Sequence, residues 1–159
     1  ITDLYDGTEG NGLGSYDLMA NSWGFDGSQY YPPHMSAWTK VELGWINPTV
    51  LIHPGTYTIR ASARQPQVYK IMAGFPEDEY ILIENRQKMD FDVALPVGGL
   101  AIYHIDDKAP WNDEGHPGQV DFPRNKQHYR VAMIQADGNF DLEKGTNRGD
   151  EGDFFFEGG

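Results

Sequence analysis

The spacing of apolar and polar positions in this chain changes near residue 46. From there onward, single apolar residues alternate with polar ones in short stretches rich in Val, Ile, Tyr and Thr, and Pro and Gly separate these stretches. A repeat of two residues is typical of β-strands that bury one face. The pattern predicts six strands, at residues 50–53, 56–63, 68–72, 80–84, 100–105 and 129–134, with a hairpin turn at 53–56.

The N-terminal part of the chain follows another pattern, which predicts loops and one helix. Residues 1–31 mix Gly, Asp, Asn and Ser with isolated apolar residues, and this composition is typical of ordered loops. A helix is expected at 34–43, because a Pro-Pro step precedes it and Met35, Trp38 and Val41 recur with helical spacing.

Together the two patterns predict an α+β chain that is mostly β. A loop-rich part with one helix, residues 1–46, precedes an antiparallel β-sandwich or barrel at residues 47–159. The Asn47-Pro48 step is the expected domain boundary, and it is equally compatible with a tight corner inside one domain.

Composition narrows the classes of protein to which the chain can belong. Its 159 residues include 12 Lys and Arg and 24 Asp and Glu, which gives a formal net charge of -12 at pH 7. This charge repels nucleic acid phosphates and anionic membrane surfaces, so no nucleic acid partner is expected. No apolar run approaches the roughly 20 residues that span a bilayer, and no membrane insertion is expected. The chain lacks cysteine and opens without Met, and we expect a soluble internal or processed fragment.

Several motifs follow one another along the chain. The first read D-L-Y-D at 3–6, Y-D-L-M at 16–19 with S-W at 22–23, and P-H-M-S-A-W-T-K-V-E-L-G-W at 33–45. Later segments read E-Y-I-L-I-E-N-R at 79–86, G-L-A-I-Y-H-I-D at 99–106 and G-D-E-G-D at 149–153. In these motifs the chain resembles the immune inhibitor A family of secreted zinc metallopeptidases over nearly its whole length. It departs from the family at Thr2, where the family usually has proline.

The resemblance implies that residues 1–46 are the C-terminal subdomain of a metzincin-like catalytic domain. The β-sandwich-like domain at 47–159 would follow it, and we expect that domain to be incomplete at its C-terminus. The resemblance makes Asp3 the third zinc ligand and places Met19 in the turn beneath the metal. The two histidines and the general-base Glu of an H-E-x-x-H helix are expected upstream, because the five histidines here are too scattered to form that motif. The alternatives are a turn carboxylate for Asp3 and ordinary core packing for Met19.

On this interpretation the chain is part of a secreted, extracellular zinc-dependent metalloendopeptidase that hydrolyses peptide bonds through a zinc-activated water. Its partners are a protein or peptide substrate and the remainder of the parent polypeptide, and the isolated chain is expected to be inactive. A different class is also open, namely a noncatalytic, calcium-stabilised β-rich extracellular module with a binding or structural role. The sequence before Ile1 distinguishes the two, since H-E-x-x-H-x-x-G there indicates the enzyme.

An acidic segment near the C-terminus predicts a calcium site. Oxygen-bearing side chains recur there at every second position and two more acids follow, the full set being Asp137, Asn139, Asp141, Glu143, Asp150 and Asp153. Ca²⁺ takes roughly six to eight oxygen ligands. The segment is not an EF-hand loop, because Leu142 and Arg148 stand where that loop has Gly and Glu. A solvated acidic loop is an equally favoured alternative, as it is for a second oxygen-rich loop at 106–114 and for Asp6 and Glu9.

Overall fold

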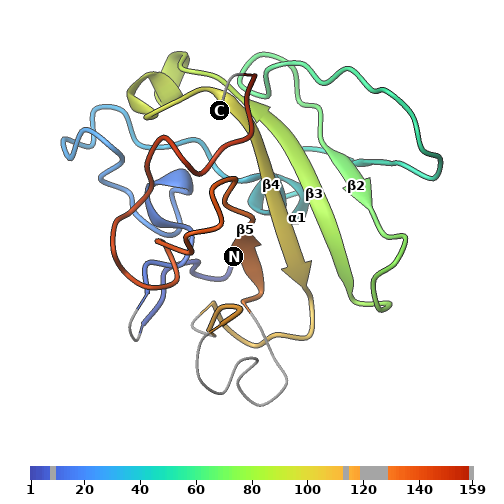
Figure 1. Cartoon of the computed structure of the whole chain (residues 1–159). Helices are drawn as coiled ribbons and strands as arrows, with labels where there is room; N and C mark the ends of the chain where they lie inside the picture. Colours follow the sequence, from blue (N-terminus) through green and yellow to red (C-terminus); the bar gives the residue numbers. More distant parts are fainter. Residues whose placement is uncertain (8–9, 113–114, 119–128, 158–159) are drawn as a thin grey trace.

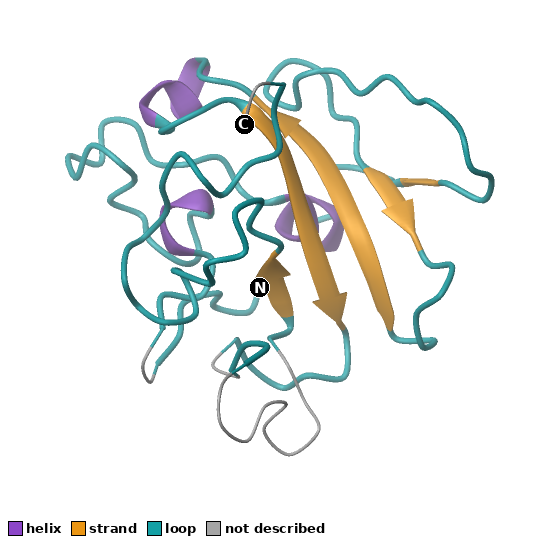
Figure 2. Ribbon diagram, in the orientation of Figure 1, coloured by secondary structure: helices purple, strands orange, loops and turns teal. Residues whose placement is uncertain are grey.

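The computed structural model describes residues 1–7, 10–112, 115–118 and 129–157. Its regular elements are few and short, and loops join them (Figure 2). In chain order these elements are η1 (Gly14–Tyr16), α1 (Ala37–Glu42), β1 (Thr49–Val50), β2 (Tyr69–Ile71), β3 (Glu79–Arg86), η2 (Asp90–Ala94), β4 (Gly99–Asp106) and β5 (Val131–Met133).

One five-stranded sheet organises the described part of the chain, with the strand order β1-β2-β3-β4-β5 (Figure 1). Strands β3 and β4 are the longest and pair antiparallel along their full length, from Glu79 opposite Asp106 to Arg86 opposite Gly99. Strand β2 joins β3 and strand β5 joins β4, both in antiparallel pairs. Only β1 and β2 are parallel. The prediction of a mostly β chain with little helix is confirmed.

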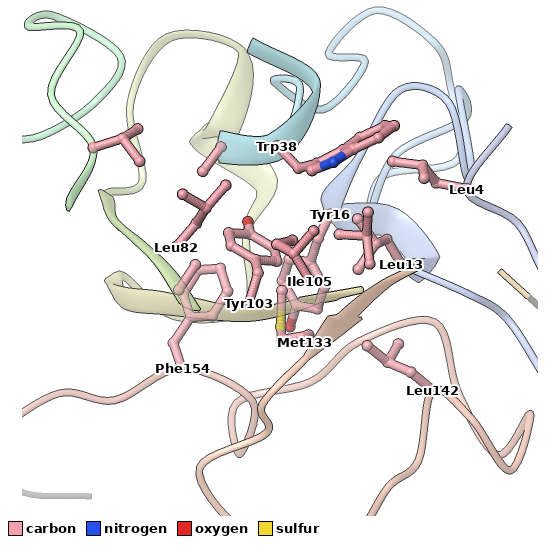
Figure 3. Packing of buried hydrophobic residues seen from close by; sticks show 14 of the residues in the cluster. Leu4, Leu13, Tyr16, Trp38, Leu82, Tyr103, Ile105, Met133, Leu142 and Phe154 are labelled. Carbon is pink, nitrogen blue, oxygen red and sulfur yellow. The ribbon is translucent and has the colours of Figure 1, made fainter. Parts of the chain in front are cut away.

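The two faces of the sheet differ in burial. On β3 and β4, alternate side chains such as Leu82, Tyr103 and Ile105 are fully buried, whereas Ile83 and Ile102 on the opposite face are only partly buried. Helix α1 contacts β3 and β4 and contributes Trp38 to the core that covers the buried face (Figure 3). The period of two seen in the sequence therefore separates a core face from a partly exposed one.

Loops from the two ends of the chain interlock and complete the core. The Asn11 amide donates to the Leu142 carbonyl at 2.7 Å, and the Ser15 amide donates to the Arg148 carbonyl at 2.7 Å. Gly14 has a φ of +52°, and a Cβ there would lie 2.5 Å from the Arg148 carbonyl oxygen, so only glycine fits this close approach. These N-terminal and C-terminal loops run beside each other in Figure 1.

Two details of the predicted β region are wrong. The described residues form a single sheet, and helix α1 together with Gly- and Asp-rich loops covers its core face, in place of the second sheet that a sandwich needs. The predicted hairpin at 53–56 is also absent, because residues 56–63 form no strand, and β1 pairs instead in parallel with β2 at the edge of the sheet.

Residues 56–63, which are predicted to form a strand, form a loop that side-chain hydrogen bonds hold to the sheet. Tyr69 donates its hydroxyl to the Thr58 carbonyl at 2.7 Å, and Asn85 donates its side-chain amide to the Ile59 carbonyl at 3.1 Å. The segment makes one isolated backbone bridge, between Ala61 and Asn85. Its carbonyls bond to side chains instead of a neighbouring strand, and this explains why an alternating sequence forms no strand here.

The predicted helix is confirmed but shorter than 34–43. Ser36 has extended backbone dihedrals, and its hydroxyl accepts a hydrogen bond from the Thr39 amide at 3.3 Å, so α1 begins at Ala37. The other end is also early, since Leu43 caps the helix and Gly44 adopts a φ of +70°.

The apolar core includes residues from both sides of the Asn47-Pro48 step, among them Leu4 and Trp38 before it and Leu82 and Phe154 after it. The two predicted parts therefore pack against one another, while a domain boundary at this step stays a prediction. Within the described ranges, none of the helices combines the length and the apolar character that crossing a bilayer requires.

Candidate functional site

The segments that carry Asp3 and Met19 lie side by side. The Leu4 amide donates to the Met19 carbonyl at 3.1 Å, and the Leu13 amide donates in turn to the Leu4 carbonyl at 3.0 Å. Gly12 allows this close approach, because a Cβ at that position would lie 2.0 Å from the Leu4 carbonyl oxygen. Leu4 is fully buried while Asp3 is exposed, so the backbone is anchored and the carboxylate faces outward.

A tight turn at Met19 is organised by the buried carboxylate of Asp17. One oxygen, Oδ1, accepts the Met19 amide at 2.6 Å. The other, Oδ2, accepts the Ser36 amide at 2.6 Å and the Thr39 hydroxyl at 2.8 Å. The carboxylate thus fixes the turn to the start of α1, and Met19 packs partly buried against the core. Asp17 was not singled out in the sequence, although an Asp two residues before the end of a turn is a recognisable side-chain cap.

A cavity of about 330 Å³ opens beside the exposed Asp3 carboxylate. Trp111 and Tyr5 line it and are 62% and 53% exposed, which is unusual for large aromatic side chains. Asn112 closes the inner wall, where its amide nitrogen donates to the Leu4 carbonyl at 3.1 Å and its oxygen accepts the Val131 amide at 2.8 Å.

Two buried ion pairs lie on the core face of the sheet behind this site. Lys40 of α1 donates to Glu84 of β3 at 2.6 Å, and the Tyr103 hydroxyl donates to the other Glu84 oxygen at 2.9 Å. Burial disfavours the charged carboxylate, but the cations of Lys40 and Arg86 outweigh it and hold the pKa of Glu84 below its ordinary value.

The second pair joins Arg86 to Asp92 of η2 through two hydrogen bonds of 2.9 and 2.6 Å. Burial opposes ionisation of Asp92 as well, yet the guanidinium beside it lowers the pKa of this carboxyl. The sequence did not lead to a prediction of these buried ion pairs. The signal that could have revealed them is that Glu84 and Arg86 continue the inward-facing positions of an alternating strand.

Asp3 is the zinc ligand that the sequence predicts in this chain. In the described ranges, no three His, Asp or Glu side chains are grouped as a metal site needs. The role of Asp3 as a zinc ligand and the H-E-x-x-H segment expected upstream both stay predictions.

The residues predicted to bind calcium lie in one C-terminal region, and most already accept hydrogen bonds from the protein. Asp137 accepts from the backbone and side-chain amides of Asn139 at 3.0 and 2.8 Å. Asp153 accepts from the Tyr16 hydroxyl at 2.8 Å and the Asp150 amide at 2.8 Å. The Glu143 carboxylate accepts a hydrogen bond from the side-chain amide of Gln135 at 2.6 Å.

Two of these acids have raised pKa values. The pKa of Glu143 is raised to about 7, mainly by burial, with smaller contributions from the charges of Asp153 and Asp141. Burial likewise raises the pKa of Asp153 to about 6, with contributions from Asp150 and Asp137. Oxygen donors in a repulsive group suit a hard cation such as Ca²⁺ in their chemistry, whereas the grouping of three ligands is absent from the described residues.

The other oxygen-rich positions have structural partners where they are described. Asp106 caps the turn that follows β4 by accepting the Lys108 amide at 2.9 Å. Asp6 accepts the Tyr129 hydroxyl at 2.6 Å. Asp107 faces the Tyr80 hydroxyl at 3.4 Å. Glu9, Asp113 and Glu114 lie outside the described residues.

Compared with family models, with curated proteins and with solved structures, the chain shows no match. The segments that contain Asp3 and Met19 are separated by a loop in the sequence, and the backbone hydrogen bond from Leu4 to Met19 brings them together.

Proposed function

We propose that the chain is part of a secreted zinc-dependent metalloendopeptidase of the immune inhibitor A-like, metzincin-like type. Asp3 would be the third zinc ligand, and Met19 would lie in the turn beneath the metal. The observation that carries this proposal is the hydrogen bond from the Leu4 amide to the Met19 carbonyl, which joins the ligand segment to the methionine turn.

The rigidity of the site supports the proposal. A metal ligand must be held in place by its surroundings before the metal arrives, because a mobile carboxylate loses entropy on binding. Here the backbone of Leu4, the residue that follows the ligand position, is hydrogen-bonded to Met19, Leu13 and Asn112, while the Asp3 carboxylate is left exposed beside a cavity.

The residues of this chain determine which roles it would have in the active enzyme. Zinc, when bound, supplies a water of lowered pKa and polarises the peptide carbonyl. The chain itself contributes one carboxylate, the methionine turn and an aromatic cavity that can receive a substrate side chain. The two imidazoles and the general base must come from the remainder of the parent polypeptide, so the isolated chain lacks activity.

The test is Asp3→Asn in the parent polypeptide, with bound zinc measured by elemental analysis and hydrolysis measured on a quenched peptide. We expect loss of hydrolysis and lower zinc occupancy, because a neutral amide is a poorer zinc ligand than a carboxylate. Asp26→Asn is the matched control, since Asp26 is an exposed aspartate in the same N-terminal loops and bonds only to Ser28. Full activity and full zinc content in the Asp3 variant would refute the assignment.

A noncatalytic, calcium-stabilised extracellular module is the second candidate. Its support is the repulsive acidic group in which Glu143 and Asp153 have raised pKa values, because a bound cation would relieve that repulsion. Zinc content separates the two candidates: a parent polypeptide that lacks both H-E-x-x-H and zinc, yet is stabilised by calcium, supports the module.

A further inference from the structure

We propose that Arg86, at the end of the central strand β3, is a positioning residue for the Met19 turn. Its guanidinium would hold the peptide group just before Asp17 and thereby set the methionine turn from the sheet. The catalytic consequence of this inference rests on the function proposed above, whereas the contact belongs to the chain itself.

Arg86 is fully buried and each of its three side-chain nitrogens is used. Nη1 donates to the carbonyl of Tyr16. Nη2 donates to the carbonyl of His34 at 3.2 Å and to Asp92 at 2.6 Å, and Nε donates to Asp92 at 2.9 Å. One side chain therefore connects the Met19 turn, the segment that leads into α1, and η2.

The chemistry of this position calls for arginine. A guanidinium presents five N–H donors in a rigid plane and stays charged when buried, whereas an ammonium is a point charge with a shorter reach. Asp92 balances the charge in the core, and its own Oδ1 also accepts the His34 amide at 3.1 Å. With the charge neutralised by Asp92, the remaining donors are free to bind main-chain carbonyls.

Two hydrogen bonds and one peptide link connect Arg86 to Met19. Tyr16 is fixed at its ring end, where the hydroxyl bonds to Asp153, and at its backbone end by Arg86. The next residue, Asp17, accepts the Met19 amide. Displacing the Tyr16 carbonyl therefore turns the peptide that leads into Asp17. Because the Asp17 carboxylate stays bound to the start of α1, the backbone at Met19 moves relative to its acceptor and that hydrogen bond is weakened.

The Lys40–Glu84 pair provides an internal comparison. It is a buried ion pair on the same strand, and Lys40 also comes from the helix side of the core. The hydrogen bond of its ammonium goes to Glu84 and not to the residues of the Met19 turn. If a buried ion pair were merely structural, removing either pair would disturb Met19 to the same degree.

The experiment uses the 159-residue chain with methyl-¹³C methionine, and follows the Met19 methyl resonance and the hydrogen exchange of the Met19 amide. We expect Arg86→Lys to shift that resonance and to speed that exchange at least tenfold, while the Met133 methyl in the same core stays in place. Lys40→Met should leave Met19 unchanged even if the chain loses as much stability. An unmoved Met19 in Arg86→Lys, or an equal effect of Lys40→Met, would overturn the proposal.

A second variant keeps the proposal testable if Arg86→Lys does not fold. Arg86→Met combined with Asp92→Leu removes both charges, so no carboxylate is left unpaired in the core, yet the Tyr16 carbonyl still loses its donor. It should release Met19 as Arg86→Lys does, and a folded double variant with native Met19 signals would count against the proposal.

In the parent enzyme, Arg86→Lys should lower kcat with KM unchanged and Arg86→Met should lower it further. A parent without peptidase activity would refute the proposed function but leave the Met19 result standing.

Discussion

Glu143 is an acid whose burial should destabilise the chain at neutral and alkaline pH. Its folded pKa is about 7 against an ordinary value of 4.5, mainly because burial disfavours the carboxylate. The folded state therefore binds more protons than the unfolded state between these values. The stability associated with Glu143 is complete below pH 4.5, falls as pH rises, and is lost above pH 7.

The size of the effect follows from the shift of about 2.5 pH units between 4.5 and about 7. At about 1.4 kcal/mol per unit, ionised Glu143 costs about 3 kcal/mol of folding free energy at pH 8 and under about 1 kcal/mol at pH 5. Glu143→Gln removes the charge but keeps an oxygen that can accept from Gln135. We expect this variant to be more stable than the native chain by about 3 kcal/mol at pH 8, or roughly 6–12 °C in melting temperature.

The assay is urea unfolding followed by tryptophan fluorescence at pH 5 and pH 8, in calcium-free buffer. Glu151→Gln is the control, because Glu151 is an exposed acid in the same C-terminal region and its removal changes net charge equally. A gain in stability that is the same at both pH values, or that Glu151→Gln reproduces, would refute the argument from burial.

Two further predictions concern metals. The isolated chain should not cleave unfolded casein even with added zinc, because one carboxylate cannot replace two imidazoles and a general base, and chelator-sensitive cleavage by the purified chain would contradict this. If the acidic group binds calcium, a chelator should lower the melting temperature and calcium should restore it, by about 2.7 kcal/mol of stability at a hundredfold excess over Kd. Sodium at equal ionic strength is the control, and identical melting curves with calcium and with chelator would exclude the site.

The strands that the sequence predicts well are those with a strong local pattern. Alternation at 80–84 and 100–105 predicts β3 and β4, because each buries one face on the same core. The same pattern misleads at 56–63, where the carbonyls of Thr58 and Ile59 bond to side chains instead of a strand. Alternation reports which side chains face the core, and it does not report what pairs with the backbone.

The candidate site, like the fold, could be predicted from the sequence only in part. Asp3 and Met19 could be proposed from motifs, but the hydrogen bond between their segments depends on Gly12 and on a fold that local spacing does not specify. The role of Arg86 is still harder to predict, since Tyr16 lies 70 residues away in the sequence. Charged residues at inward positions of a strand indicate buried partners, but they do not indicate which ones.

The interlocked loops have a consequence for the timing of folding. The backbone amides of Asn11 and Ser15, which lie in the segment between Asp3 and Met19, donate to the carbonyls of Leu142 and Arg148. A ribosome releases a polypeptide with its N-terminal side first, so these loops cannot adopt their final conformation until the segment that contains Leu142 and Arg148 has been synthesised. A product truncated before residue 142 would carry both predicted metal-centre residues without the contacts that fix them. Synthesis of this later segment would then set the earliest time at which the centre could assemble.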